Sequence, residues 1–265
     1  MPIITLLTDF GLQDHYVGAL KGAILSINPG ASIVDLTHEI PPHDIWAAAF
    51  HLLAVYQSFP AGTVHLAVVD PGVGSARRGI IVNCAGQFFV GPDNGLFSWI
   101  CEREESSSAI HLTNQKYFRH PVSDTFHGRD VFAPVAAALS NGVACTEFGP
   151  VIDDLIQLKS LSPGRLDGGV IEATIIHIDR FGNCITNLTR DHVAEDKIAA
   201  GAKLVVNSHV VSSFRAFFAD SGDGELFCLF GSAGFLEIAA RNSSAAKILS
   251  AERGQPAFLL LGRAD

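Results

Sequence analysis

The sequence has few cysteines, little charge and no long apolar segment. Its 265 residues include five cysteines, which are odd in number and far apart, and none belongs to a Cys-x-x-Cys pair or a Cys/His zinc spacing. This cysteine usage favours a reducing, cytoplasmic location over a disulfide framework. No apolar run approaches the roughly 18 residues of a membrane helix, and the N-terminal segment lacks the basic start of a signal peptide. A membrane protein is therefore not expected.

A basic surface is also missing. Charged residues make up 17% of the chain, and the formal net charge is −9. Without a basic stripe there is no footprint for a phosphate backbone, so neither nucleic acid nor an anionic membrane is expected as a partner. Apolar residues make up 48%, which is typical of a globular protein with a sizeable core.

The first part of the chain alternates apolar, β-branched runs with helical periodicity. The runs are nearly continuous, as in strands that are covered on both faces. This alternation predicts an α/β domain with a mostly parallel sheet, over residues 1–160. The expected strands are 3–7, 32–35, 64–69, 79–83 and 87–90, and the expected helices are 15–27, 44–59 and 131–141.

The last 100 residues have a different pattern, with short strand candidates and few helices between them. We expect a smaller C-terminal β-barrel domain over residues 166–265. Its strand candidates are 170–178, 203–206, 209–211, 226–230, 235–239 and 257–261.

Polar side chains follow several of the expected strands. In α/β sheets, ligands bind beyond the carboxyl ends of strands, so these positions are candidates for a site. A further cluster of ionisable residues precedes the helix at 131–141. The groups are Thr8–Gly11, Asp70–Gly74 with Arg77, Pro92–Gly95, Asp179–Asn183 and Asp124–Asp130.

Each group also has a purely structural interpretation. Thr8-Asp9 could cap a helix, Pro92–Gly95 is a good turn in its own right, and Asp124 or Asp130 could pair with Arg129. The Gly-Val-Gly at 72–74 lacks the spacing of a phosphate-binding loop.

The acids and the histidine of these groups also allow a metal site as an alternative. A metal-dependent phosphohydrolase could use Asp9, Asp70, Asp93 and His127. However, no HxH, HExxH or DxDxD spacing supplies several ligands together, so no metal site is predicted.

Six motifs in order along the chain resemble one family. They are TDFG, VVDPGVGSARR, GPDNGL, FHGRDVFAP, DRFGNCITN and GSAGFLEIA. Together they resemble the S-adenosylmethionine (SAM) hydrolases that form adenosine, also called SAM hydroxide adenosyltransferases, which are relatives of the fluorinating and chlorinating SAM enzymes.

The resemblance implies a catalytic set of Asp70, Arg77 and His127, and a ribose-binding acid at Asp9. It also implies an N-terminal α/β domain, a C-terminal β-barrel domain and a homotrimer that holds SAM at subunit interfaces. SAM is then the substrate, and no cofactor is implied. Positions around the amino-acid and adenine ends of SAM fall on Asp179, Asn183, Ser232 and Glu237, and ring contacts fall on Phe126 and Phe181, for which apolar core is the alternative.

The implied reaction is attack of water on C5′ of the ribose, which releases adenosine and L-methionine. The sulfonium leaves as a neutral thioether, so the difficult step is activation of water by a base. Asp70 and His127 are both candidates, and the sequence leaves the choice open. Two other functions also remain open: a non-catalytic SAM- or adenosine-binding protein, and halide-dependent cleavage of SAM, which an anionic Asp70 would disfavour.

Overall fold

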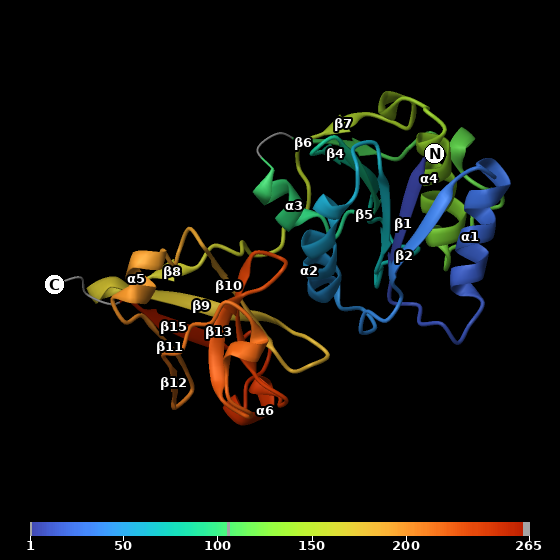
Figure 1. Cartoon of the computed structure of the whole chain (residues 1–265). Coiled ribbons are helices and arrows are strands. Elements are labelled where there is room, and N and C mark those ends of the chain that lie inside the picture. Colours follow the sequence, from blue (N-terminus) through green and yellow to red (C-terminus); the bar gives the residue numbers. More distant parts are fainter. Residues whose placement is uncertain (1, 105–106, 262–265) are drawn as a thin grey trace. The chain divides into compact units, whose positions relative to one another are not determined.

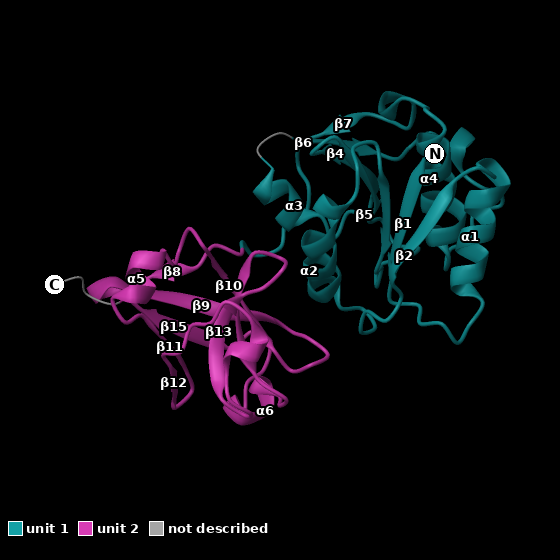
Figure 2. Cartoon of the chain, viewed as in Figure 1, with its two compact units in different colours: residues 1–160 teal, residues 161–265 magenta. Residues whose placement is uncertain are grey.

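The computed structural model describes residues 2–104 and 107–261. The chain divides into two compact units (Figure 2), residues 1–160 (unit 1) and residues 161–265 (unit 2). Within the described part of the chain, no helix has both the length and the apolar character needed to cross a bilayer.

Unit 1 is built on a seven-stranded sheet in the order β2-β1-β3-β5-β4-β6-β7. The first four strands of this order pair in parallel, so the carboxyl ends of β1, β3 and β5 meet at one edge of the sheet. The strands are β1 (Ile3–Thr8), β2 (Ser32–Thr37), β3 (Val64–Val68), β4 (Gly79–Cys84), β5 (Gln87–Pro92), β6 (Ser107–His111) and β7 (Val151–Ile152).

The prediction of a mostly parallel sheet is wrong for the other half of the sheet. Strands β4, β5, β6 and β7 pair antiparallel, so the sheet is mixed. Only Ala85 and Gly86 separate β4 from β5, both with positive φ. A two-residue connection of this kind closes a hairpin, whereas a parallel pair needs a crossover of a dozen or more residues.

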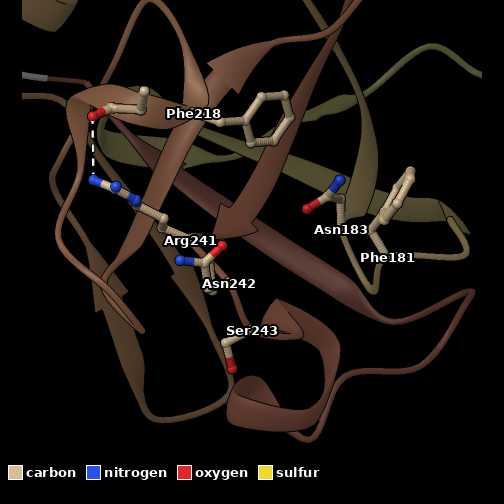
Figure 3. A pocket seen from close by; sticks show the side chains of 8 residues that line it. Phe181, Asn183, Phe218, Arg241, Asn242 and Ser243 are labelled. Carbon is tan, nitrogen blue, oxygen red and sulfur yellow. Dashed lines mark hydrogen bonds between the residues drawn. The ribbon is translucent and has the colours of Figure 1, made fainter.

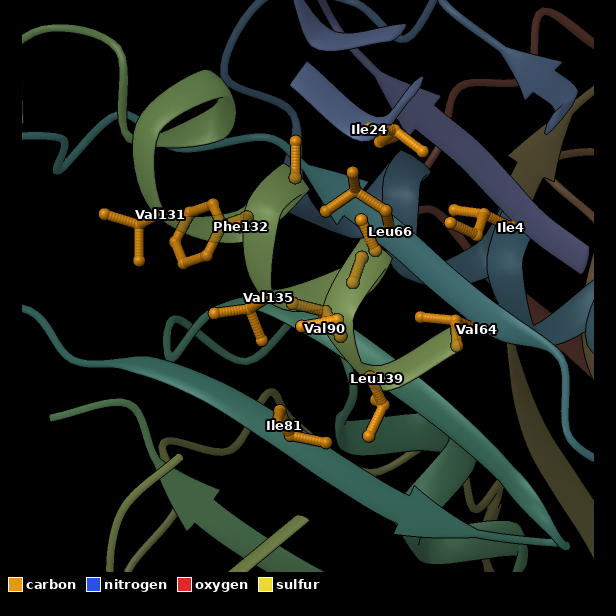
Figure 4. Close-up of a cluster of buried hydrophobic side chains, with 14 of the residues drawn as sticks. Ile4, Ile24, Val64, Leu66, Ile81, Val90, Val131, Phe132, Val135 and Leu139 are labelled. Atoms are coloured by element: carbon orange, nitrogen blue, oxygen red, sulfur yellow. The ribbon is translucent and has the colours of Figure 1, made fainter. Parts of the chain in front are cut away.

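Helices cover both faces of this sheet, with α1 and α4 on one face and α2 and α3 on the other (Figure 1). Apolar side chains of the sheet pack against α1 and α4 in one continuous cluster that includes Leu66 and Phe132 (Figure 4). The helices are α1 (Tyr16–Ile27), α2 (Ile45–Val55), α3 (Ser98–Arg103), α4 (Ala133–Ser140), the π-helix η3 (Gly128–Phe132) and the 3₁₀ turns η1 (Tyr56–Ser58), η2 (Gln115–Tyr117) and η4 (Cys145–Glu147).

Unit 2 is an antiparallel, barrel-like sheet in the order β12-β11-β15-β9-β10-β14-β13, with β8 paired to β9. Its two end strands also approach each other, and Phe214, just after β12, bridges to Cys228 of β13. The predicted α/β class with a C-terminal barrel is therefore confirmed. The strands are β8 (Gly164–Arg165), β9 (Val170–Ile178), β10 (Cys184–Thr189), β11 (Lys203–Val206), β12 (His209–Val211), β13 (Leu226–Phe230), β14 (Phe235–Ala240) and β15 (Pro256–Leu260), and the helices are α5 (Glu195–Ala199), α6 (Ala245–Leu249), η5 (Asp167–Gly169) and η6 (Phe218–Asp220).

Candidate functional site

The edge of the sheet where β1 and β3 end holds a cavity of about 320 Å³. The segments after these strands supply the acids Asp9 and Asp70, and the segment before η3 supplies His127. Ligands are expected at this edge because the loops beyond parallel strands leave a crevice there. The cavity is lined by Asp9, Phe10, Tyr16, Pro42, His43, Val68, Asp70, Val73 and 125–128.

Asp70, Arg77 and His127 form one hydrogen-bonded group at this cavity. The Arg77 guanidinium donates from Nε to Asp70 Oδ1 (2.9 Å) and from Nη2 to Asp70 Oδ2, and the same Nη2 lies 2.8 Å from His127 Nδ1. Arg77 also lies over the Phe132 ring, 5.1 Å from its centroid. The cavity wall includes Asp70 and His127 but not Arg77. The guanidinium therefore contacts these two side chains without lining the cavity itself.

The contact with Arg77 determines which nitrogen of the His127 ring carries the proton. Because a guanidinium can only donate, Nδ1 of His127 must accept, and the ring proton is on Nε2. Burial, followed by the positive charge of Arg77, lowers the pKa of His127 below its ordinary value. His127 is therefore a neutral hydrogen-bond donor through Nε2.

The neighbouring Arg78 faces different partners. Its guanidinium binds the buried Asp93 at 2.9 and 2.6 Å, and it binds the exposed Asp154 at 2.6 Å. Asn94 donates to the carbonyl of Val69, directly before Asp70. The Pro92–Gly95 group thus contacts the end of β3 and is not among the described residues that line the cavity. This agrees with its structural interpretation.

A close backbone approach joins the Asp70 turn to the His127 segment. Gly74 has φ +79°, and a Cβ there would lie 2.4 Å from the carbonyl oxygen of Asp124. Only glycine fits this position. On the same segment, Asp130 is fully buried and pairs with Arg129, which confirms the structural interpretation of that acid.

Asp9 lies in the loop that follows β1. Its Oδ2 accepts from the backbone N–H of His43 at 2.9 Å, and its side chain lines the cavity. The helix-cap alternative for Thr8-Asp9 is wrong, because α1 begins at Tyr16.

Aromatic rings form one wall of the cavity. Phe126 packs edge-on against Phe10 and Tyr16, with ring centroids 5.8 and 5.3 Å away. Phe126 is thus both buried, as its core alternative predicted, and part of the cavity wall. This wall keeps water away from one side of the site.

Unit 2 has a separate cavity of about 680 Å³, lined by Phe181, Asn183, 218–219 and 240–243. Phe181 is 77% exposed, which excludes its core alternative. In Figure 3, the Asn183 side chain faces the segment 241–243 across the cavity.

Asp179 holds the turn that carries Phe181 and Asn183. Its Oδ1 accepts from both backbone N–H groups at 2.9 and 2.8 Å, and its Oδ2 accepts from Asn183 Nδ2 at 2.8 Å. One N–H of the Asn183 amide donates to Asp179, so the amide oxygen and the second N–H are left for a ligand.

Ser232 and Glu237 lie elsewhere in unit 2. Ser232 is exposed and Glu237 is half-buried, and neither is among the described residues that line the cavity. Burial, then the charge of Asp179, raises the pKa of Glu237 to about 7, so Glu237 and Asp179 are close enough to interact.

Sequence reasoning missed His38 and His43, which lie in the loop between β2 and α2. His43 lines the cavity, and His38 contacts Thr8 directly beside Asp9. The rule that selected the other groups, polar residues after a strand, would have found Thr37-His38-Glu39 after β2. For metals, residues 2–104 and 107–261 contain no cluster of three or more His, Cys, Asp or Glu side chains suited to an ion.

Comparison with known protein families shows which family the chain belongs to. The SAM hydroxide adenosyltransferase N-terminal domain matches residues 4–149, and the C-terminal domain of the same family matches residues 173–257. The chain belongs to the SAM hydroxide adenosyltransferase family. The resemblance inferred from the six motifs is confirmed.

Individual proteins are similar to this chain over nearly its whole length. The (R)-S-adenosyl-L-methionine hydrolase of Methanocaldococcus jannaschii is 37% identical, covering 95% of this chain and 93% of the relative. A fluorinase of Actinoplanes sp. is 28% identical over 92% of each chain. The crystal structure of an uncharacterized conserved protein from Thermotoga maritima matches with a TM-score of 0.89 and 35% identity, over 98% of this chain and all of that one.

Proposed function

We propose that the protein hydrolyses SAM to adenosine and L-methionine by attack of water on C5′ of the ribose. The observation that carries the proposal is the group Asp70–Arg77–His127, joined by hydrogen bonds at the wall of a cavity that also contains Asp9. The 37% identity to a relative named (R)-S-adenosyl-L-methionine hydrolase supports the choice of substrate.

Asp70 is the base that the geometry favours. His127 Nδ1 accepts from Arg77, so its lone pair is occupied, and Nε2–H is left to donate to the oxygen of the attacking water. Asp70 binds Arg77 with both oxygens, but each carboxylate oxygen accepts a second hydrogen bond. Asp70 can therefore accept a proton from water while Arg77 holds the carboxylate in place.

The proposed step balances without a further reactant. The water oxygen forms a bond to C5′, and the C5′–S bond breaks with its electron pair going to sulfur. One proton of the water goes to Asp70, and the other stays on the new 5′-hydroxyl of adenosine. Because sulfur leaves as a neutral thioether, no cofactor is needed to stabilise a leaving anion. We propose that SAM is a substrate and that the reaction uses no cofactor.

Substrate binding is assigned to both units. The free oxygen of Asp9 is suited to accept from the ribose hydroxyls, since a carboxylate accepts several hydrogen bonds, and Phe126 forms the apolar wall beside it. In unit 2, Phe181 would stack on the adenine ring, and Asn183 would bind its polar edge. Asp179, Ser232 and Glu237 are assigned to the adenine and amino-acid ends.

We also propose a homotrimer that binds SAM at its subunit interfaces, and a cytoplasmic location. The exposed Phe181 on a cavity wall is a surface that a neighbouring subunit would cover, and the five free cysteines fit a reducing compartment. Light scattering of the purified protein checks the assembly. The mass of three chains is expected, and the mass of one chain would contradict the trimer.

Halide-dependent cleavage is the second candidate, favoured by the 28% identity to a fluorinase. The cavity argues against it, because a halide ion needs donors on every side, whereas Asp70 offers an acceptor. Water can use both Asp70 and the Nε2–H of His127.

Product analysis separates these functions. Purified protein is incubated with the separate sulfur epimers of SAM, with and without fluoride or chloride, and with EDTA as a control for metal dependence. Adenosine and methionine in every incubation with the (R) epimer are expected. Unchanged SAM would indicate a binding protein, a 5′-haloadenosine would indicate a halogenating enzyme, and methylthioadenosine would indicate cleavage of a different bond.

A further inference from the structure

Two buried histidines of unit 1 contact threonines of β1 in the same way. His65 Nδ1 lies 2.7 Å from Thr5 Oγ1, and His38 Nδ1 lies 2.8 Å from Thr8 Oγ1. The exposed fractions of the two residues are 0% and 4%. The pairs differ in position, since Thr5 lies in the middle of β1 and Thr8 lies at its end, next to Asp9.

The far sides of the two rings have different surroundings. His65 Nε2 lies 3.2 Å from the neutral amide oxygen of Gln87, and the ring stacks on Phe89. Burial lowers the pKa of His65 to about 4, so this ring is a neutral part of the core.

His38 instead faces a charged partner. Its Nε2 lies 3.2 Å from Asp35 Oδ1, and Asp35 pairs with Lys21 at 2.6 Å. Burial raises the pKa of Asp35, but the hydrogen bonds from Lys21 and His38 outweigh it and hold the pKa below its usual value. Outside this ion-pair contact, Nε2 has no hydrogen-bond partner within the described ranges. The ring is therefore held between an ionised carboxylate and Thr8.

The loop that starts at His38 contacts the Asp9 segment at three points. Besides the Thr8 contact, the carbonyl of His38 accepts from Gly11 N at 2.8 Å, and His43 N donates to Asp9 Oδ2 at 2.9 Å. Thr8 Oγ1 in turn accepts from Phe10 N at 3.2 Å. The 38–43 loop thus contacts Asp9 itself and also Thr8 and Gly11, which lie before and after it in the chain.

One of these contacts is made by strained backbone. His43 has φ +68°, a conformation that is unfavourable for a residue with a side chain. Strain of this kind persists where the surrounding structure imposes it, and it is concentrated at functional sites. Here it directs the His43 N–H at Asp9.

We propose that His38 is a positioning residue for the ligand-binding acid Asp9. It anchors the 38–43 loop to Thr8 and Gly11, so that the loop holds one oxygen of Asp9 and leaves the other for the ribose hydroxyls of the nucleoside. This inference rests on the proposed function, in which Asp9 binds the ribose. A residue that acts through Asp9 must lose its effect when Asp9 is absent.

A double-mutant cycle on the full chain tests this requirement, with adenosine as the probe in calorimetric titrations. His38→Ala should weaken adenosine binding about tenfold in the wild-type background and less than about twofold in the Asp9→Ala background. Equal losses in both backgrounds, or no loss in either, would overturn the inference. A wild-type chain that does not bind adenosine would instead overturn the proposed function on which it rests.

Further variants separate positioning from folding. Thr8→Val keeps the shape of the side chain and removes the hydroxyl, so it should reproduce the His38→Ala loss and remain informative if His38→Ala does not fold. Thr8→Ser, which restores the hydroxyl, should recover most of the affinity. His65→Ala is the matched control. It should lower the melting temperature and leave the affinity for adenosine unchanged, whereas a loss of affinity equal to that of His38→Ala would contradict the special role of His38.

Discussion

The cavities of the two units are built from different chemistry. The unit 1 cavity holds an acid and an imidazole tied to one guanidinium, with a second acid nearby. The unit 2 cavity is lined by aromatic rings, amides, small side chains and one guanidinium, that of Arg241. The nearby acid Asp179 is not in its lining and holds the turn that carries Asn183. Under the proposed function, unit 1 would carry the reaction and bind the ribose, and unit 2 would recognise the adenine. Substitutions of Asp70 and Arg77 should therefore change kcat, and those in the unit 2 cavity should change KM.

The largest effect is expected for Asp70→Asn. The amide keeps the shape of the side chain but cannot accept a proton from water, so kcat should fall about 10²–10⁴-fold. The affinity for adenosine should change little. Steady-state kinetics and calorimetry measure the two quantities, and a variant that loses only affinity would move Asp70 from catalysis to binding.

The neighbouring Arg77 and Arg78 provide a matched pair. Arg77→Lys removes the guanidinium that donates to both Asp70 and His127. Because a lysine cannot replace this binding at two points, kcat should fall about 10–100-fold. Arg78→Lys weakens only the contacts with Asp93 and Asp154. It should leave kcat unchanged and lower the melting temperature by about 2–4 °C. Equal kinetic losses in both variants would show that the Arg77 effect is structural.

In unit 2, Phe181→Ala should raise KM about tenfold, because a ring that stacks on a base contributes this much to binding. The change in kcat should be small. Phe217→Ala is the control, since Phe217 is 58% exposed and does not line the described cavity. A fall in kcat without a change in KM for Phe181→Ala would contradict the division between the units.

The smallest effect concerns pH. Burial and the charge of Arg77 lower the pKa of His127 below the ordinary value of 6.5, so the ring stays neutral at neutral pH. Protonation would place a donor against the Arg77 guanidinium, and kcat/KM should fall as the pH decreases through a midpoint below 6.5. In His127→Asn, the amide oxygen accepts from Arg77 without titrating, so the part of this acidic limb that His127 contributes should disappear. A midpoint above 6.5 would contradict the assigned state of His127.

The sequence predicted the class of both units and most strands, because continuous apolar runs are a strong signal. Strands 170–178, 203–206, 209–211 and 226–230 have the predicted bounds. Strand β10 was missed because it contains Thr186 and Asn187, which are polar. Both are buried, and distant backbone groups satisfy them, including the carbonyls of Leu236 and Leu161. Such long-range partners are invisible in a local pattern.

The site was predictable in its residue types but not in its connections. Asp70, Arg77, His127 and Asp9 all follow from polar groups at strand ends and from the family motifs. The sequence could not say that Arg77 binds Asp70 and His127 while Arg78 binds Asp93, since adjacent residues can point in different directions. It also could not choose the base, which depends on the single contact between Arg77 and His127 Nδ1.

In the proposed reaction, the group Asp70–Arg77–His127 directs water at C5′ of SAM. The most direct measurement is the mass of the products formed in ¹⁸O-labelled water, for the wild-type chain and for Asp70→Asn. The label should enter the 5′-hydroxyl of adenosine and not methionine, and Asp70→Asn should form the same product far more slowly. Unlabelled adenosine, label in methionine, or an Asp70→Asn variant as fast as the wild-type chain would contradict the proposed reaction.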